Sequence, residues 1–147
     1  MATAFFAGSF NPFTMGHRDI VERASEIFDH IIIGVGENST KESSVPAKLR
    51  AEDIRHTCPG TTVVVYSGLT AHAAKAHGAT VLLRSLRNAN DLAYETPIAE
   101  TNRREFGIET FFLLARPELA HVSSSLVREL AQHGHNVGHL LGATPNN

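Results

Sequence analysis

Short apolar runs alternate with longer amphipathic stretches along the chain, and neither a linker nor a repeat interrupts the alternation. The short runs are largely apolar or β-branched, as strands buried on both faces are, and predict strands at residues 3–7, 30–35, 62–66, 80–84 and 110–114. The longer stretches carry apolar or alanine-rich faces at helical spacing, and predict helices at residues 18–28, 46–57, 70–77, 91–106 and 124–132.

This order of elements predicts an α/β fold in which a five-stranded parallel sheet carries helices on both faces, joined by right-handed crossovers. We expect one domain over residues 1–147, with Pro97 as a candidate bend in its helix. Open sheets of this kind bind ligands outside the carboxyl ends of their strands. The informative segments are therefore the loops that follow Ala7, Val35, Arg84 and Leu114.

Composition narrows the function classes. Hydrophobic residues make up 42% and charged residues 19%, as in folded globular proteins, and the net charge of -2 provides no global basic field for nucleic acid. A single cysteine, Cys58, excludes an internal disulfide framework and a multi-thiolate metal site. Neither a signal-like start nor an apolar stretch of membrane-spanning length occurs, so we expect a cytoplasmic protein without membrane or nucleic-acid partners.

The loop after the first predicted strand, residues 8–17 (GSFNPFTMGH), has the composition of an anion site. Gly8 and Gly16 allow the backbone to approach a ligand closely, and the free N–H groups of the following helix favour an anion. His17 stands at that helix start, where its ring could add a charge-assisted hydrogen bond to a phosphoryl oxygen. The alternative is a histidine that only caps the turn from loop to helix.

Two further strand ends offer cations. Arg84 and Arg87 follow the fourth strand, and their guanidinium forks suit phosphate. The alternative is that one of them pairs with Asp91 or Glu95 inside the domain. Lys41 lies on a polar loop after the second strand, where an isolated lysine is most often a solvated surface residue.

Serines and histidines dominate the polar positions near the C-terminus. The serine run at residues 123–125 is an N-cap signal, and equally a second helix start that could hold a nucleotide phosphate. His133, His135 and His139 cluster further on, and two of them could share a helical face. Without a neighbouring carboxylate or thiolate ligand, we expect no protein-bound metal there.

Together these motifs resemble one family. The segment at residues 8–17, with Thr14 and Gly16-His17 at its end, resembles the (H/T)xGH signature of the nucleotidyltransferases, and Thr14 makes it most similar to bacterial phosphopantetheine adenylyltransferase. Residues 84–103 (RSLRNANDLAYETPIAETNR) are similar to that family's RGLRxxxDFEYExxxAxxNR block, and residues 122–129 (VSSSLVRE) to its ISSSLVRE block. The three motifs follow the family's order and spacing.

The resemblance implies a Rossmann-like nucleotidyltransferase fold and a reversible transfer of the adenylyl group of ATP to 4'-phosphopantetheine, which gives dephospho-coenzyme A and pyrophosphate in coenzyme A biosynthesis. It also implies Mg²⁺ held mainly by the ATP phosphates, inhibition by coenzyme A and assembly as a homohexamer. The acceptor is a phosphate monoester, already anionic at neutral pH, so an in-line displacement needs neither a general base nor a covalent enzyme intermediate. Positioning and electrostatic stabilisation would then supply the catalysis.

The same resemblance assigns roles to individual residues. His17 is implied as the catalytic group that stabilises the transferring α-phosphate. The acceptor side comprises Ser9, Lys41, Thr70 and Arg84. The implied ATP contacts are Ser9, Phe10, His17, Ser85, Leu86, Arg87, Glu95, Leu119, Ala120, His121, Val122, Ser123, Ser124 and Ser125.

Some residues depart from the family pattern. Ser9 stands in place of threonine, Ser85 in place of glycine, and Asn11 in place of aspartate. Asn11 also fits nicotinamide mononucleotide adenylyltransferases, so that activity, or another small-molecule nucleotidyltransferase, is the alternative within enzymes. A non-catalytic nucleotide-sensing domain is the alternative outside them.

Overall fold

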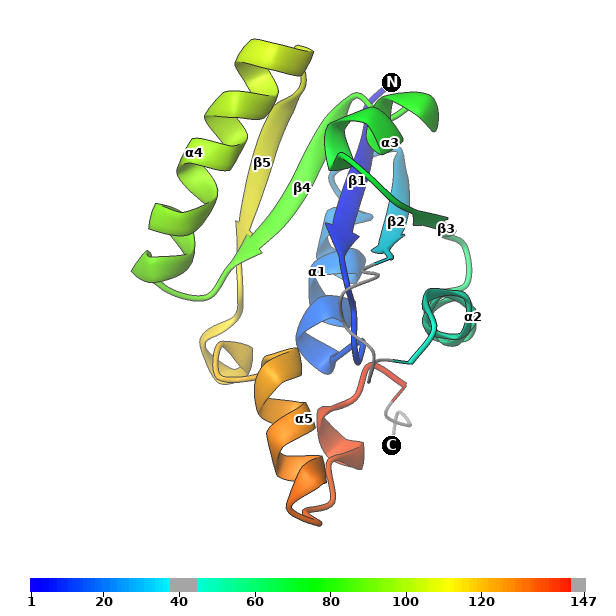
Figure 1. The fold of residues 1–147 in the computed structure, drawn as a ribbon, viewed down its shortest axis with the longest axis vertical. Helices are drawn as coiled ribbons and strands as arrows, with labels where there is room; N and C mark the ends of the chain where they lie inside the picture. The colour runs from blue at the N-terminus through cyan, green and yellow to red at the C-terminus, as the bar shows by residue number, and fades with distance from the viewer. Residues whose placement is uncertain (38–44, 144–147) are drawn as a thin grey trace.

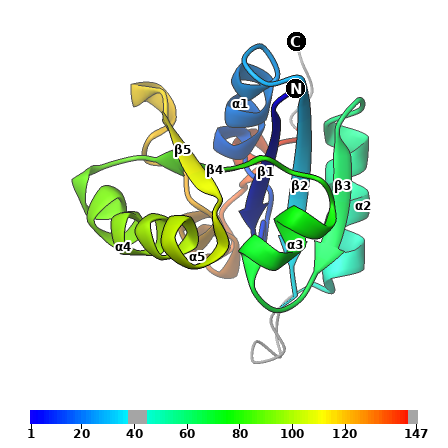
Figure 2. The ribbon, with the colours of Figure 1, turned by 90° about the horizontal axis from the view of Figure 1, so that it is seen from above.

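The computed structural model describes residues 1–37 and 45–143, which form an open, five-stranded parallel sheet in the order β3-β2-β1-β4-β5 with helices on both faces (Figures 1 and 2). The predicted α/β class is confirmed. The elements, in chain order, are β1 (Thr3–Gly8), α1 (Met15–Ala24), β2 (His30–Gly36), α2 (Ala47–Thr57), β3 (Thr62–Tyr66), α3 (Thr70–Ala76), β4 (Val81–Leu86), α4 (Ala89–Phe106), β5 (Glu109–Leu114), the short 3₁₀ helix η1 (Pro117–Leu119), α5 (Ser124–Gln132) and a second 3₁₀ helix, η2 (Gly138–Leu140).

Side chains alternate across the sheet and build a core on each face. On one face, Ala4 and Phe6 of β1 pack with buried residues of α1 and α2. On the other, Phe5 and Ala7 of the same strand pack with the alanines of α3. Because both faces of β1 and β2 are covered, these strands consist almost entirely of apolar residues, which is why their positions could be predicted.

The chain reverses its direction across the sheet between β1 and β4. Strands β1, β2 and β3 follow one another toward one edge, after which the chain returns to place β4 on the other side of β1. In open α/β sheets the loops diverge at such a point and leave a crevice at the carboxyl ends of the two strands. Helix α5 lies beyond those ends, below the sheet in Figure 1.

Two boundaries differ from the prediction in ways that matter for the site. Helix α1 begins at Met15 and ends at Ala24, not at residues 18–28, because Thr14 caps it three residues before His17. Strand β4 continues to Leu86, so that residues 85 and 86 belong to the strand and not to the loop after it.

Helix α4 is continuous through Pro97. It begins two residues earlier than predicted, because the Asn88 side chain accepts a hydrogen bond from the Asp91 N–H at 2.9 Å and so caps the helix. Pro97 lies on the exposed side, where solvent can satisfy the carbonyl that loses its helical partner. Within residues 1–37 and 45–143, the structure contains no helix with the length and apolar character needed to cross a membrane.

Candidate active site

Two cavities adjoin at the carboxyl ends of β1 and β4. The first, of about 420 Å³, is lined by the loop after β1 and by parts of α1, β4, α4 and α5. The second, of about 350 Å³, extends toward β3 and the start of α3. They share a wall formed by Ala7, Gly8, Ser9, Arg84, Tyr94 and Glu95. Two ligands bound in these cavities would therefore meet at this wall.

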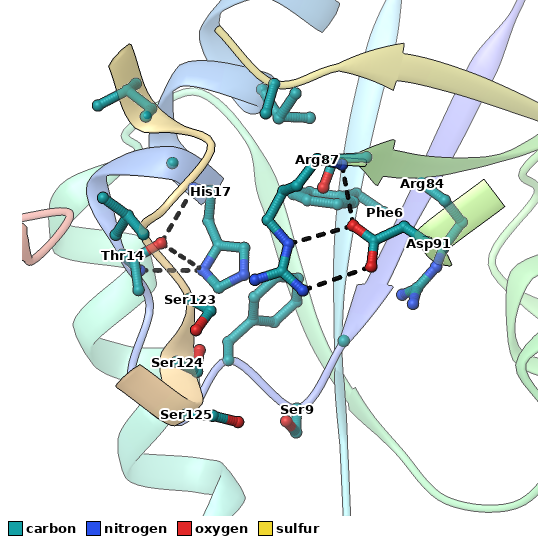
Figure 3. A pocket seen from close by; sticks show the side chains of 18 of the residues that line it. Phe6, Ser9, Thr14, His17, Arg84, Arg87, Asp91, Ser123, Ser124 and Ser125 are labelled. Carbon is teal, nitrogen blue, oxygen red and sulfur yellow. Dashed lines mark hydrogen bonds and ion pairs between the residues drawn. The ribbon is translucent and has the colours of Figure 1, made fainter. Parts of the chain in front are cut away.

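The start of α1 places His17 in the first cavity. Thr14 is the N-cap, and its side-chain oxygen accepts a hydrogen bond from the His17 backbone N–H at 3.3 Å. In return, Nδ1 of His17 accepts a hydrogen bond from the Thr14 backbone N–H at 2.9 Å (Figure 3). This reciprocal pair is a capping box, and it ties the imidazole to the end of the helix.

Aromatic rings surround the imidazole. Phe13 is stacked on it with centroids 5.4 Å apart, and Phe10 meets it edge-on at 4.9 Å. Phe6 lies 6.3 Å away, and all three phenylalanines are buried. Phe10 has a φ of 47°, a conformation that costs energy in a residue with a side chain. The packing that holds Phe10 there therefore also fixes the position of the His17 ring.

Burial, and then the charges of Arg84 and Arg87, lower the pKa of His17 to about 4. The imidazole is therefore neutral at pH 7. The phenylalanines and the arginines thus disfavour the imidazolium form in the ligand-free protein, and a charge-assisted hydrogen bond from His17 to a bound phosphoryl oxygen stays a prediction. What His17 can offer to a ligand in this state is a neutral ring N–H.

Arg84 lies at the shared wall and is oriented by Glu95. Its Nη2 and Nε donate to the same oxygen of Glu95, at 2.6 and 3.1 Å, and its Nη1 donates to the Ala7 carbonyl at 2.5 Å. The Glu95 side chain is 9% exposed and that of Arg84 37%. The ion pair is thus buried on the carboxylate side and open on the guanidinium side.

Arg87 pairs with Asp91 in the first turn of α4. Its backbone N–H and its Nε both donate to Oδ2 of Asp91, at 2.9 and 3.2 Å (Figure 3). Burial alone would raise the pKa of Asp91, but the hydrogen bonds and charge of Arg87, together with the charge of Arg84, hold it below its ordinary value. The alternative weighed from the sequence, pairing with a carboxylate, holds for both arginines, and both also line the first cavity.

The N-terminus of α5 closes the opposite side of the first cavity. Ser123 caps the helix by accepting the Leu126 N–H at 3.1 Å. Ser124 donates to the Pro12 carbonyl at 2.7 Å, and Arg128 donates to the Asn11 carbonyl at 2.5 Å. These bonds attach α5 to the loop after β1, so that two helix N-termini face one cavity.

Most of the residues predicted for the site come together. The first cavity is lined by Ser9, Phe10, His17, Arg84, Ser85, Arg87, Glu95, Leu119, Val122, Ser123, Ser124 and Ser125. Thr70 lines the second cavity, together with Ser9 and Arg84.

Of the predicted residues that the structure describes, three do not line these cavities. Leu86 and Ala120 instead line a third cavity, outside the turn between β4 and α4. His121 is exposed. Lys41 lies outside the described residues.

Sequence reasoning missed Arg50, which is buried and holds the loop after β1 through the backbone of Ser9. Its Nη1 donates to the Ser9 carbonyl, and its Nε donates to the Val45 carbonyl at 2.7 Å. The signal was its spacing, because Arg50 falls three residues from Ala47 and four from Ile54, on the buried face of α2. An arginine on such a face must find buried acceptors, and here these include the loop that carries Ser9.

Within the described residues, no three histidine, cysteine or acidic side chains are grouped so that they could hold a metal ion. His135 and His139 have ring centroids 6.5 Å apart. The carboxylates that line the first cavity, Asp91 and Glu95, both accept hydrogen bonds from arginines.

Comparisons with known proteins agree with this geometry. The model of the Cytidylyltransferase-like family matches residues 5–130. The phosphopantetheine adenylyltransferase of Porphyromonas gingivalis is 43% identical over 141 residues, which cover 94% of this chain and 92% of the relative. That of Christiangramia forsetii is 40% identical over 139 residues, which cover 92% of each.

Among solved structures, a bifunctional NMN adenylyltransferase/ADP ribose pyrophosphatase from Francisella tularensis has a TM-score of 0.62 at 13% identity. The match covers 98% of this chain and 45% of that longer chain, and it establishes the fold. Family model, sequence relatives and fold lead to the same assignment. The chain belongs to the Cytidylyltransferase-like family and, within it, to the phosphopantetheine adenylyltransferases.

Proposed function

We propose that the protein transfers the adenylyl group of ATP to 4'-phosphopantetheine, reversibly, and yields dephospho-coenzyme A and pyrophosphate. The observation that carries the proposal is the pair of adjoining cavities with Ser9, Arg84 and Glu95 in their common wall. ATP in the first cavity and the acceptor in the second would bring the acceptor phosphate and the α-phosphate together at this wall. Such proximity is a large part of what an in-line displacement requires.

The walls of the second cavity fit a pantetheine arm. They are partly apolar, with Phe5, Leu82 and Ile98 among them, and the hydroxyl and amide groups of Tyr66, Thr70, Thr110 and Asn102 are interspersed. A chain with a dimethyl group and two amides matches such a mixture. Nicotinamide mononucleotide, the alternative acceptor, has a cationic ring and a ribose, and no described residue other than Asn11 favours it. Asn11 itself meets α5 through its backbone carbonyl.

The two described arginines have separate tasks in the proposed reaction, and Lys41, outside the described residues, would assist at the acceptor phosphate. Arg84, at the shared wall, would bind the acceptor phosphate, and Arg87, on the first-cavity side, would bind the phosphates of ATP. His17 would act at the α-phosphate, and the N–H groups at the start of α5 would receive the remaining phosphate oxygens. No protein nucleophile takes part, because the acceptor oxygen is itself anionic.

The site also fits a nucleotide that brings its own Mg²⁺. Asp91 and Glu95 are engaged by arginines, so ATP phosphates and water would supply most of the ligands of the ion, as Mg²⁺ sites at nucleotides commonly have. Bound in this way, Mg²⁺ would neutralise charge on the leaving pyrophosphate. The proposal further includes a cytoplasmic homohexamer that coenzyme A inhibits, as the resemblance implies.

The test is pyrophosphate release by the purified protein with ATP and Mg²⁺. The assay would offer 4'-phosphopantetheine, nicotinamide mononucleotide and glycerol 3-phosphate in parallel, with products identified by mass and His17→Ala as the control for contaminating activity. We expect turnover with 4'-phosphopantetheine and a product with the mass of dephospho-coenzyme A. Turnover with another acceptor alone would refute the acceptor assignment. ATP binding without any turnover would refute the enzymatic one.

A further inference from the structure

His17 occupies a position in the capping box of α1 that normally belongs to another residue type. In this motif the side chain three residues after the N-cap accepts a hydrogen bond from the N-cap backbone, and glutamate or glutamine usually stands there. Here His17 takes that place, with its Nδ1 2.9 Å from the Thr14 backbone nitrogen. One ring nitrogen of His17 therefore accepts a capping hydrogen bond of the helix, and the rest of the ring faces the cavity.

This contact determines where the ring carries its hydrogen. A nitrogen that accepts a hydrogen bond from a backbone N–H has no hydrogen of its own, so the hydrogen of the neutral ring is on Nε2. Oγ1 of Thr14 lies 3.2 Å from the same Nδ1. Since this oxygen already accepts the His17 backbone N–H, its own hydrogen is free to point at Nδ1. A hydrogen on Nδ1 would clash with the hydrogen of the Thr14 backbone N–H, which points at the same nitrogen.

We propose that Thr14 is a positioning residue that holds His17 as a neutral imidazole with its proton on Nε2, so that His17 donates one uncharged hydrogen bond to the transferring phosphate. This inference rests on the proposed function. It assigns His17 neither a proton transfer nor a positive charge. Thr14 lines the first cavity but is only 1% exposed, and its backbone N–H and its hydroxyl are both directed at Nδ1 of His17, so its effect on the reaction passes through His17.

The surroundings of the ring agree with a neutral donor. Phe10 and Phe13 cover it, and the edge opposite Thr14 is directed toward the side of the cavity where Arg87 lies (Figure 3). The charged groups that face this space are Arg84 from β4, Arg87 from the following turn, and Asp91 and Glu95 from α4; the last two accept hydrogen bonds from the two arginines.

Such an arrangement has a catalytic advantage. The arginines supply the positive charge in the cavity, and the imidazole supplies a directed N–H dipole. A donor whose direction is set before substrate binds need not reorganise during the reaction. Burial and the two arginines, which lower the pKa of His17 to about 4, keep this donor in one protonation state over the neutral range.

The direct test is ¹⁵N NMR of the ring nitrogens in the full chain, uniformly labelled, at pH 7.5, with His17→Gln used to assign the His17 signals. We expect a neutral ring with hydrogen on Nε2. A proton on Nδ1, or an imidazolium at this pH, would overturn the inference. Because this measurement needs no substrate, it decides the inference even if the protein turns over none of the acceptors, an outcome that would count only against the proposed function.

Activity variants test the consequence. Thr14→Val removes the hydroxyl at nearly constant volume, and we expect kcat to fall about tenfold, with KM for ATP changed less than about threefold, as for an interaction that strengthens in the transition state. Thr14→Ser should restore kcat to within about twofold. Ser25→Ala, which removes a 2.7 Å hydrogen bond at the other end of α1, should leave kcat unchanged. Equal kcat values for the parent and Thr14→Val would overturn the positioning role.

Substitution of His17 itself separates a neutral donor from a cation. Glutamine can accept the Thr14 N–H with its oxygen and still present an uncharged N–H₂ to the cavity, whereas alanine presents nothing and lysine presents a charge. Loss of one preorganised donor costs about 10²- to 10³-fold in kcat, which is the loss expected for His17→Ala. His17→Gln should retain at least about tenfold more activity than His17→Ala. The activity of His17→Lys should not exceed that of His17→Gln. Activity of His17→Lys above that of His17→Gln would show that charge is what the site needs.

Discussion

Protonation of His17 should by itself destabilise the fold when the pH is lowered from 8 to 5. The pKa of this group is about 4 in the folded protein and 6.5 for an unperturbed histidine, so between these values the unfolded chain binds a proton that the folded chain does not. Its contribution to stability is therefore complete above pH 6.5 and is lost as the pH falls toward 4. A difference of this size corresponds to about 3 kcal/mol when the loss is complete, and to about 2 kcal/mol at pH 5.

The assay is urea unfolding of the parent protein and of His17→Gln at pH 8, 6.5 and 5. All samples would have one protein concentration, because self-association would otherwise shift the midpoint. The two proteins share every ionisable group except His17, so the difference between the two pH profiles isolates its contribution. Glutamine keeps the capping box, which makes the variant a matched reference. Between pH 8 and 5 the parent should lose about 2 kcal/mol more of its unfolding free energy than the variant.

Parallel profiles for the two proteins would refute the reasoning. They would mean that the imidazole binds its proton as readily in the folded protein as in the unfolded chain. The enclosure by Phe10 and Phe13 and the proximity of Arg84 and Arg87 would then not disfavour the imidazolium. A steeper profile in the variant than in the parent would refute it as well, because the sign of the linkage would be reversed.

Three further substitutions test the packing and the ion pairs of the site by urea unfolding. Arg84→Ala leaves the Glu95 carboxylate, which is only 9% exposed, without its partner. It should lower the free energy of unfolding by about 2 kcal/mol, less than for a fully buried pair because Arg84 is 37% exposed. The double variant Arg84→Ala/Glu95→Ala should recover part of this stability, and a double variant that recovers none of it would contradict the argument. Ser124→Ala removes the 2.7 Å hydrogen bond between α5 and the first loop, and should cost about 1 kcal/mol and raise KM for ATP; unchanged stability would show that this attachment contributes nothing. Gly34→Ala places a Cβ 2.3 Å from a ring carbon of a buried phenylalanine of β1 and should cost at least about 1–3 kcal/mol. Gly36→Ala, whose Cβ would have only ordinary contacts at 3.6 Å or more, is the near-neutral control, and equal costs for the two variants would refute the steric explanation.

The strands could be predicted because burial on both faces requires almost continuous runs of apolar residues. The ends of helices are less evident in the sequence. Met15 and Gly16 read as loop residues in the sequence, and the signal that starts α1 at Met15 is the capping box between Thr14 and His17. That motif is normally read from glutamate or glutamine at its last position. A histidine there makes the helix start harder to recognise, although the same capping box holds the ring that we propose to be catalytic.

The contents of the site were predictable where the carboxyl ends of β1 and β4 carry polar residues, and less so where partners come from different elements. Arg84 and Glu95 lie eleven positions apart, on a strand and a helix, so periodicity within either element does not report their 2.6 Å contact. For the same reason, the sequence left phosphate binding and carboxylate pairing open as alternatives for each arginine. Arg50, which the prediction missed, is the opposite case, because its spacing on α2 indicates burial but not which carbonyls it meets.

Carboxylate pairing and phosphate binding are in fact compatible at these positions. A guanidinium has five N–H groups. In the described chain, Arg84 uses three of them, toward Glu95 and Ala7, and Arg87 uses two, toward Asp91. The remaining N–H groups are therefore available to a ligand, and their directions are set by the bonds already made.

The pairing does, however, remove the net charge. Two arginines and two carboxylates sum to zero, and His17 is neutral at pH 7. Among the described residues, attraction to two polyanionic substrates therefore comes from groups that present N–H dipoles, which are the free guanidinium donors, the Nε2–H of His17 and the N-termini of α1 and α5. Cations that arrive with the nucleotide, and Lys41 outside the described residues, would add positive charge. A site built in this way binds phosphate by direction more than by charge. It can therefore distinguish the geometry of the transition state from that of two separate substrates better than a cluster of unpaired cations, which would attract both alike.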